Sequence, residues 1–247
     1  MDKPWLFILG CNNSGTTLLY NLLGRHPQID PLKKEGQDSP HMPFTNDYRD
    51  DYGFGLNRVW TEKLGLFRNP DVKNIERLTQ SWLNMRASKG GKYIMEKSPP
   101  DAVRSLWLQE HFSPAWFVGI VRNGYAVCEG IKRKKGGAIN YERAARHWAK
   151  ANEVMLNDSK KLMHFKLFRY EDLTENTEKT MQSLEKYLDL SQHDYSDTGI
   201  IDLGYSHFSP SKIVNMNQKS INALDPNQRE IIHENAKEML ERFYYEL

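Results

Sequence analysis

Short, continuously apolar runs alternate with segments of helical periodicity along this chain. The first run covers residues 5–9 and ends at Gly10, which predicts a buried strand of a parallel sheet. A small polar turn at residues 11–17 comes next, and leucines at helical spacing then run to Gly24 and Pro27, where the predicted helix ends. This order predicts an anion cradle, because main-chain N–H groups and the helix dipole meet at the start of the helix.

Further apolar runs predict strands at residues 93–95, 116–121 and 162–168. Each is followed by a segment with one apolar helical face, and a last helix closes the chain. The first predicted helix is capped by Ser98 and runs to Leu108, the second ends in the basic run 132–135, and the third covers residues 141–157. The fourth has Met181, Leu184 and Leu188 on one face, and the last begins at Asp225 and Pro226. The alternation predicts a single α/β domain over residues 1–247, with a three-layer, doubly wound parallel sheet flanked by helices.

Two long segments break this alternation. Residues 28–60 are polar and irregular, and a connection of that length in a compact domain predicts a substrate loop. Asn69 and Pro70 then resemble the cap and first residue of a helix that ends at Gly90. Residues 36–90 are therefore predicted to be a substrate loop and a helical insertion, and residues 191–222 a second loop.

Composition narrows the picture only a little. The chain has 247 residues, 39% of them hydrophobic and 27% charged, which is typical of one large domain with a sizeable core. A net charge of +2 gives no reason to expect a nucleic-acid partner. Cys11 and Cys128 form neither a disulfide framework nor a metal-ligand set, which fits a reducing compartment. With an apolar strand almost at Met1 and no apolar run near the length of a membrane span, we expect a cytoplasmic protein without a membrane partner.

The turn after the first strand indicates which anion it binds. A nucleoside-triphosphate loop carries a lysine where this chain has Thr16. The run from Ser14 to Thr17 instead resembles the 5′-phosphosulfate loop, roughly G-x-P-R-S-G-T-T, of sulfotransferases that use 3′-phosphoadenosine 5′-phosphosulfate (PAPS). The later pair His26–Pro27 also resembles that family. Asn12 and Asn13 differ from it, because they stand where the family has proline and a basic residue.

Three later segments resemble the same family. The segment VRNGYAVCEG is similar to its second signature, R-[DN]-P-x-x-x-x-x-S, with Arg122 as the arginine and with Gly124 and Gly130 in place of the proline and serine. The segment RYEDL is similar to its Y-E-D-L run, and EKSPP to its E-K-S-P run. The matches extend from residue 4 to 247 and leave about residues 36–90 uncovered.

The resemblance implies the P-loop-like sulfotransferase fold and a place nearer to the carbohydrate-type and tyrosylprotein-type branches than to the cytosolic small-molecule enzymes. It implies PAPS as donor, 3′-phosphoadenosine 5′-phosphate (PAP) as product, no metal, and a carbohydrate, tyrosyl or small-molecule hydroxyl as acceptor. The acceptor itself and the oligomeric state are not indicated. The implied nucleotide-binding residues are Asn12, Asn13, Ser14, Gly15, Thr16, Thr17, Arg122, Gly130, Tyr170 and Lys212.

Two residues are candidates for the chemistry of transfer. Sulfuryl transfer is an in-line displacement that needs a general base for the acceptor and a cation near the leaving phosphate, by analogy with phosphoryl transfer. Glu35 lies nine residues after His26, an offset that resembles the base of the carbohydrate-type and tyrosylprotein-type branches. Lys97 is implied to lie near the phosphosulfate, where it could supply the charge that Asn13 lacks. His41 and His111 are alternative bases.

Two other functions remain open from the sequence. A P-loop kinase or nucleotidase predicts a lysine at the position of Thr16 and an acidic partner for magnesium. A nucleotide-binding or interaction protein without catalysis would fit the departures at Asn13 and Gly130. A comparison of PAP binding with ATP binding distinguishes a sulfotransferase from a kinase or nucleotidase. Release of PAP from PAPS distinguishes a sulfotransferase from a protein that only binds the nucleotide.

Overall fold

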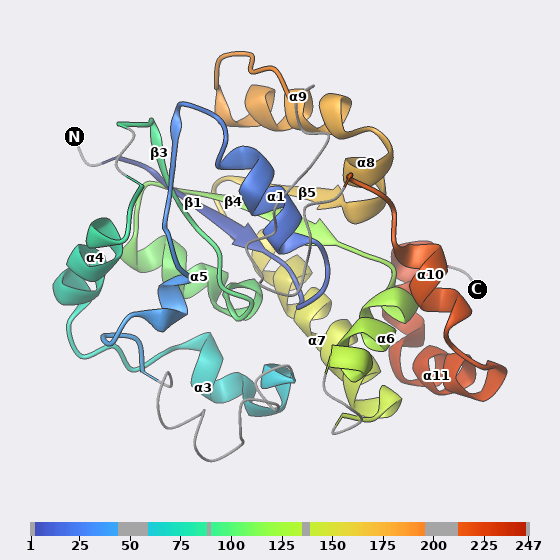
Figure 1. Cartoon of the computed structure of the whole chain (residues 1–247). Coiled ribbons are helices and arrows are strands. Elements are labelled where there is room, and N and C mark those ends of the chain that lie inside the picture. Colours follow the sequence, from blue (N-terminus) through green and yellow to red (C-terminus); the bar gives the residue numbers. More distant parts are fainter. Residues whose placement is uncertain (1–2, 44–58, 88–89, 135–138, 196–211, 246–247) are drawn as a thin grey trace.

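The computed structural model describes residues 3–43, 59–87, 90–134, 139–195 and 212–245. Within these ranges the secondary structure alternates between strands and helices, as the sequence predicts (Figure 1). In chain order the elements are β1 (Trp5–Leu9), α1 (Thr16–Leu23), β2 (Ile29–Pro31), η1 (Gly36–Asp38), η2 (Trp60–Lys63), α3 (Leu64–Arg68), α4 (Ile75–Asn84), β3 (Tyr93–Glu96), α5 (Asp101–His111), β4 (Ala115–Val121), α6 (Gly124–Lys134), α7 (Tyr141–Ser159), β5 (Phe165–Arg169), α8 (Tyr170–Glu175), α9 (Thr177–Leu188), α10 (Asn217–Asn222) and α11 (Pro226–Arg242).

The strands form one sheet in the order β2-β3-β1-β4-β5, and every pairing is parallel. Trp5 of β1 lies opposite Ile94 of β3 on one side and Ala115 of β4 on the other. The strand order reverses at β1, because β3 and β4 flank it although they are far from it in sequence. In such sheets ligands bind outside the carboxyl ends of the strands at the point of reversal, which here is the end of β1.

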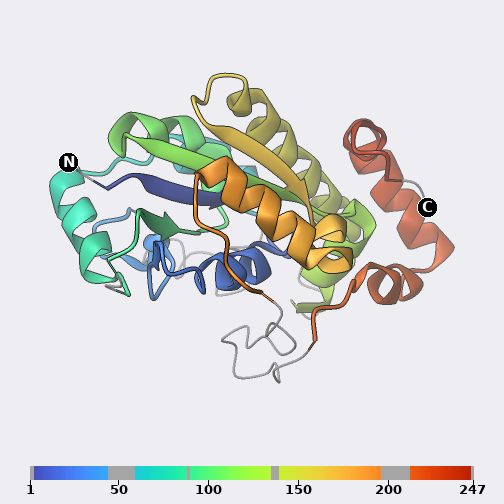
Figure 2. The same cartoon turned by 90° about the horizontal axis from the view of Figure 1, so that it is seen from above.

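Side chains of β1 alternate between the two faces of the sheet, as the pleat of a strand requires. Leu6 and Ile8 pack in one cluster with residues of α1 and α9, while Phe7 packs in another with residues of α4 and α5. Figure 2 shows the sheet between α1 and α9 on one side and α5 and α7 on the other. Both faces are therefore covered, which explains why β1 is apolar at every position.

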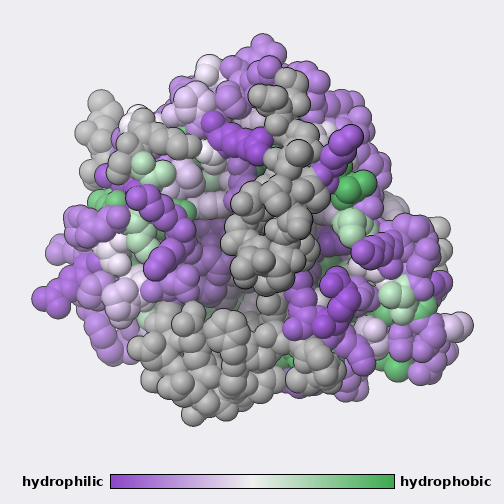
Figure 3. Space-filling model, in the orientation of Figure 1, coloured by the Kyte–Doolittle hydropathy of each residue, from purple (hydrophilic) through white to green (hydrophobic). Residues whose placement is uncertain are grey.

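A third cluster joins the helices that follow β4. Helices α6, α7 and α11 pack around Trp148, and Cys11 and Cys128 lie buried in the same cluster as unpaired thiols. Burial raises the pKa of both thiols, so they act here as small apolar side chains. No helix among the described residues is long and apolar enough to cross a membrane. The face seen in Figure 3 is mostly hydrophilic, with small and separate apolar patches.

Several predicted boundaries are wrong. The helix expected from Asn69 begins at Ile75, where the side chain of Asn74 accepts a hydrogen bond from the N–H of Arg77. Ser98 does not cap the next helix, which begins at Asp101, because its hydroxyl binds Glu96 instead. The strand expected at residues 162–168 lies at Phe165–Arg169.

The two predicted loops also contain regular structure. Strand β2 and the short helix η1 lie in the segment 28–60, and α10 lies in the segment 191–222. Strand β2 has three residues and, among the described strands, pairs with β3 alone, so its structure depends on a partner more than 60 positions later. Residues 44–58 and 196–211, which make up much of both segments, lie outside the described residues.

Candidate active site

The turn between β1 and α1 is tightly folded. The N–H of Ser14 donates to the carbonyl of Cys11 at 3.1 Å, and Asn13 and Gly15 have φ values of 62° and 93°. A Cβ at Gly15 would lie 2.6 Å from Cδ2 of Tyr170, so the ring of Tyr170 packs directly on this glycine. Glycine is the residue that both the left-handed backbone and the close ring allow.

The same turn holds buried polar atoms without partners. Within the described residues, the hydroxyl of Ser14 and the side-chain N–H₂ of Asn13 are buried and make no hydrogen bond. Leaving such a group unsatisfied costs about 1–3 kcal/mol, so a ligand is expected to supply the missing partner. Because both groups lie at the start of α1, where the helix dipole favours negative charge, that ligand is expected to be an anion. Thr16 and Thr17 form the first turn of α1, which has no side-chain cap at Gly15. The residues of the turn therefore fit a phosphate group.

Arg122 joins this turn from the end of β4. Its Nη1 donates to the carbonyl oxygen of Asn13 at 2.9 Å, and its guanidinium lies 4.2 Å from the centre of the Tyr170 ring. Burial lowers the pKa of Arg122, yet an arginine keeps its charge at neutral pH because its ordinary pKa is so high. The structure thus brings together a fixed cation, an aromatic ring and the turn, as a phosphorylated nucleoside requires.

Glu171 braces this arrangement from α8. Its Oε1 accepts from the N–H of Asn123 at 3.0 Å and from Nδ2 of Asn217 at 2.6 Å, while Oε2 accepts from the hydroxyl of Tyr245 at 3.0 Å. Asn217 Oδ1 in turn accepts from Nε of Arg122 at 2.8 Å. Sequence reasoning did not single out Asn217, because these contacts join positions that are 46 to 95 apart in the chain.

Glu35 and Lys97 form an ion pair on the other side of the turn. Lys97 directly follows β3, and its Nζ also lies 3.5 Å from Oγ1 of Thr17 in α1. Gln37 Nε2 donates to the second carboxylate oxygen of Glu35 at 2.5 Å. The Lys97 side chain is 7% exposed and that of Glu35 27%, so the pair lies at the edge of the interior. The two predicted catalytic residues therefore contact each other, and Lys97 also contacts Thr17 in the first turn of α1.

A buried network holds the segment that carries Glu35. Glu96 Oε1 accepts from the N–H of Gly36 at 2.7 Å and from the hydroxyl of Ser98 at 2.6 Å, and Trp82 Nε1 donates to the carbonyl of Gly36 at 2.9 Å. Burial raises the pKa of Glu96 well above its ordinary value, and the negative charge of Asp101 raises it further. The environment of Glu96 thus favours its protonated form, and its Oε1 anchors the segment through two hydrogen bonds.

Glu96→Gln should flatten the pH dependence of the free energy of unfolding. Because the pKa of Glu96 is raised in the folded chain, the folded chain holds this proton to a higher pH than the unfolded chain, which releases it above the ordinary pKa of 4.5. The stability that this proton contributes is complete below that value and is lost as the pH rises toward the folded pKa, by about 1.4 kcal/mol per pH unit. Glutamine does not ionise, so the free energy of unfolding of the variant should rise relative to that of the wild type by about 1.4 kcal/mol for each pH unit.

Urea titrations between about pH 5 and pH 7 measure this slope. Glu238→Gln, which changes an exposed glutamate of α11, is the matched control and should follow the wild type. Parallel curves for Glu96→Gln and the wild type would mean that the folded chain ionises Glu96.

The remaining predicted residues fall into two groups. Asn12 Oδ1 accepts from the indole N–H of buried Trp60 at 2.8 Å, and a Cβ at Gly130 would lie 3.5 Å from Cγ of Asn13, so both residues border the turn. Lys212 is exposed and forms no hydrogen bond or ion pair with another predicted site residue in the part of the chain that the structure describes. Of the alternative bases, His111 stacks on Trp107 within α5.

A cation that the sequence reasoning did not single out also reaches the turn. Nζ of Lys134, at the end of α6, donates to Oδ1 of Asn13 at 2.7 Å. The signal was present in the sequence, because Lys134 lies four residues after Gly130 and therefore on the same face of the helix.

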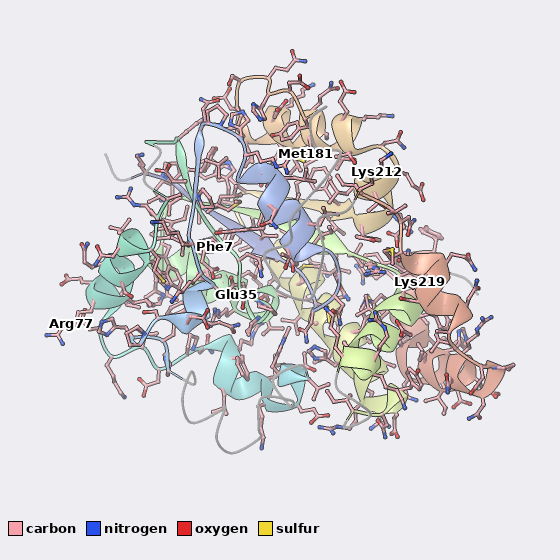
Figure 4. All side chains as sticks on the ribbon, viewed as in Figure 1. Phe7, Glu35, Arg77, Met181, Lys212 and Lys219 are labelled. Atoms are coloured by element: carbon pink, nitrogen blue, oxygen red, sulfur yellow. The ribbon has the colours of Figure 1, made fainter. Side chains whose placement is uncertain are left out.

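A pocket of about 810 Å³ lies between α4 and the segment around Glu35. Lys33, Lys34 and Arg77 line it together with His41, and Asp38 is its acidic residue. Among the described residues, neither of the two lysines forms an ion pair, and nor does Arg77. In Figure 4 Glu35 lies at the centre of the molecule and Arg77 at its edge on α4. The pocket is therefore basic, and its lining includes the two lysines that precede Glu35.

Comparison with known proteins finds similarity to sulfotransferases. Protein-tyrosine sulfotransferase 2 of Gallus gallus is 25% identical over 208 residues, which are 80% of this chain and 53% of that protein. The chain thus spans about half the length of this relative.

Solved structures share the fold. The sulfotransferase domain of the Synechococcus PCC 7002 olefin synthase has a TM-score of 0.61 and 20% identity, covering 99% of this chain and 95% of its own. Mouse sulfotransferase SULT7A1, solved with PAP, has a TM-score of 0.54 and 11% identity, covering 98% and 86%. The model of the sulfotransferase family matches residues 4–194, most of the chain and the whole sheet with its turn. This chain belongs to the sulfotransferase family.

Proposed function

We propose that this protein transfers the sulfuryl group of PAPS to a hydroxyl acceptor. The turn between β1 and α1 carries the proposal: buried Ser14 and Asn13 atoms there have no partner in the described chain, and Thr16 replaces the lysine of a triphosphate loop. Membership of the sulfotransferase family supports the same donor. A P-loop kinase is less well supported, because that lysine is missing.

The residues of the turn and of β4 would hold the nucleotide. The hydroxyls of Ser14, Thr16 and Thr17 and the main-chain N–H groups at the start of α1 suit the 5′-phosphate. Arg122 offers a charged partner for a further phosphate, and the ring of Tyr170 supports that guanidinium. When bound, PAPS supplies the sulfuryl group and a phosphate as its leaving group.

Glu35 and Lys97 suit the two remaining tasks. The carboxylate of Glu35 accepts the proton of the acceptor hydroxyl, while the ammonium of Lys97 stabilises negative charge near Thr17, where the leaving phosphate oxygen is expected. An ammonium has three donors, so Lys97 can contact Glu35 and a phosphate oxygen together. The ion pair also fixes the direction of the carboxylate before an acceptor arrives.

The basic pocket supports an acceptor that carries an anionic group. Lys33 and Lys34 line the pocket and directly precede Glu35, so a carboxylate or sulfate held there could leave a hydroxyl within reach of the base. The acceptor is therefore proposed to be an acidic carbohydrate, peptide or small molecule rather than a neutral lipid-like one.

Calorimetry with PAP and with magnesium-ATP tests the donor. PAP should bind and ATP should not, because the turn lacks the lysine that reaches the terminal phosphates of ATP. Transfer of labelled sulfate from PAPS to phenol and to 4-hydroxybenzoate then tests the acceptor, and the carboxylate-bearing phenol should be the better substrate. Binding of magnesium-ATP without any heat from PAP would contradict the proposed function.

A further inference from the structure

The two departures from the family pattern lie in contact with each other. Asn13 replaces a basic residue and Gly130 replaces a serine, and a Cβ at Gly130 would lie 3.5 Å from both Cγ and Nδ2 of Asn13. That is ordinary contact distance for a methyl group, so any longer side chain at this position would compete with the Asn13 amide for space. The glycine therefore leaves room for Asn13 to turn toward α6.

The Asn13 amide faces a lysine of that helix. Lys134 Nζ donates to Asn13 Oδ1 at 2.7 Å. Asn13 has a φ of 62° and therefore adopts the left-handed backbone conformation. An amide oxygen is neutral, so this bond places the ammonium beside the turn without cancelling its charge. The other end of the amide, Nδ2, is one of the buried donors without a partner among the described residues.

The neighbours of Lys134 in the basic run have other roles. Lys132 Nζ lies 4.8 Å from the centre of the Tyr141 ring, and Arg133 forms an ion pair with Glu129 at 2.8 Å. Glu129, the acidic residue one turn earlier on α6, is thus bound to Arg133. Of the three described basic residues at this helix end, Lys134 is the one whose side chain contacts the turn.

We propose that Lys134 supplies the nucleotide-binding turn with the cation that its own sequence lacks. Asn13 holds the ammonium in place, Gly130 makes room for Asn13, and Lys134 and Arg122 bind Asn13 through its side chain and its carbonyl respectively. The ligand is the phosphate of the bound nucleotide, so the inference rests on the proposed function. The positive charge beside the phosphate site would thus come from α6 and not from the turn between β1 and α1.

The affinity for PAP, measured by calorimetry, tests this role without requiring turnover. Lys134→Met should weaken PAP binding by about 10- to 100-fold, the loss expected for one hydrogen bond to a charged group. Lys132→Met, which changes a lysine of the same helix end, should stay within about twofold of the wild type. The slope of the logarithm of affinity against the logarithm of salt concentration should become shallower for Lys134→Met only.

Moving the charge back into the turn completes the test. The double variant Asn13→Lys with Lys134→Met should recover most of the lost PAP affinity, and Lys134→Arg should keep it. Lys134 is exposed, so the variants should fold, and unfolding curves check this. If the wild type binds PAP and Lys134→Met binds it equally well, this inference is wrong while the proposed function stands. If the wild type binds no PAP, the proposed function itself fails.

Discussion

Glu35→Gln should lower the turnover number by about 10²- to 10⁴-fold, the usual contribution of a general base, while PAP affinity changes little. The amide keeps the shape of the side chain and its contact with Gln37, but it cannot take the proton of the acceptor hydroxyl. Lys97 would also lose its ion pair, so some of the loss could come from a displaced ammonium. Rates at saturating PAPS and acceptor, beside calorimetry with PAP, measure the two quantities separately.

Asp38→Asn is the matched control for this variant. It removes an acidic residue that lies three positions after Glu35 and lines the basic pocket. It should leave the turnover number within a few-fold of the wild type and affect mainly the Michaelis constant of a charged acceptor. Normal turnover by Glu35→Gln would show that the base is another group, and His41 would then be the next residue to replace.

Gly15→Ala should destabilise the fold by about 2–4 kcal/mol and weaken PAP binding at least tenfold. An alanine at a φ of 93° is strained, and its Cβ would lie 2.6 Å from the ring of Tyr170, which must then move. The same ring lies against Arg122, so the displacement should spread to the proposed phosphate contact. Denaturant unfolding and calorimetry with PAP measure the two effects.

Substitutions at two other glycines distinguish backbone strain from the steric contact with Tyr170 as the cause of the loss of stability. Gly90 also has a positive φ, 75°, but a Cβ at this position would have no neighbour within 4 Å, so Gly90→Ala should cost only the backbone strain of about 1–2 kcal/mol. Gly65, in α3, has open space and an ordinary φ, and Gly65→Ala should stabilise by about 0.5–1 kcal/mol. Equal losses at Gly15 and Gly90 would mean that the Tyr170 contact does not matter.

The features that sequence reasoning predicted well are local in the chain. The run from Trp5 to Leu9, the glycine-containing turn and the leucines of α1 carry their structure within about 20 residues. Arg122 could be predicted to reach the site, because carboxyl ends of parallel strands share one edge of the sheet. Glu35 and Lys97 depended on a family resemblance, and the structure shows that the two side chains form an ion pair.

The features that were missed depend on contacts between distant positions. Lys134 and Asn13 are 121 positions apart. The spacing from Gly130 puts Lys134 on the same face of α6, but its hydrogen bond to Asn13 depends on how the turn packs against that helix. Ser98 has the sequence signature of a helix cap, but its hydroxyl donates instead to the buried carboxyl of Glu96. Tertiary partners thus overrode local preference where polar groups are buried.

The hydrogen bond from the indole of Trp60 to Asn12 constrains how this turn can vary. Trp60 is almost completely buried, so proline at position 12 would strand its N–H inside the protein, a cost that natural selection would oppose. Among descendants of this sequence, a change of Asn12 to proline should therefore occur only together with a replacement of Trp60. The two positions should behave as one inherited unit, although 48 residues separate them.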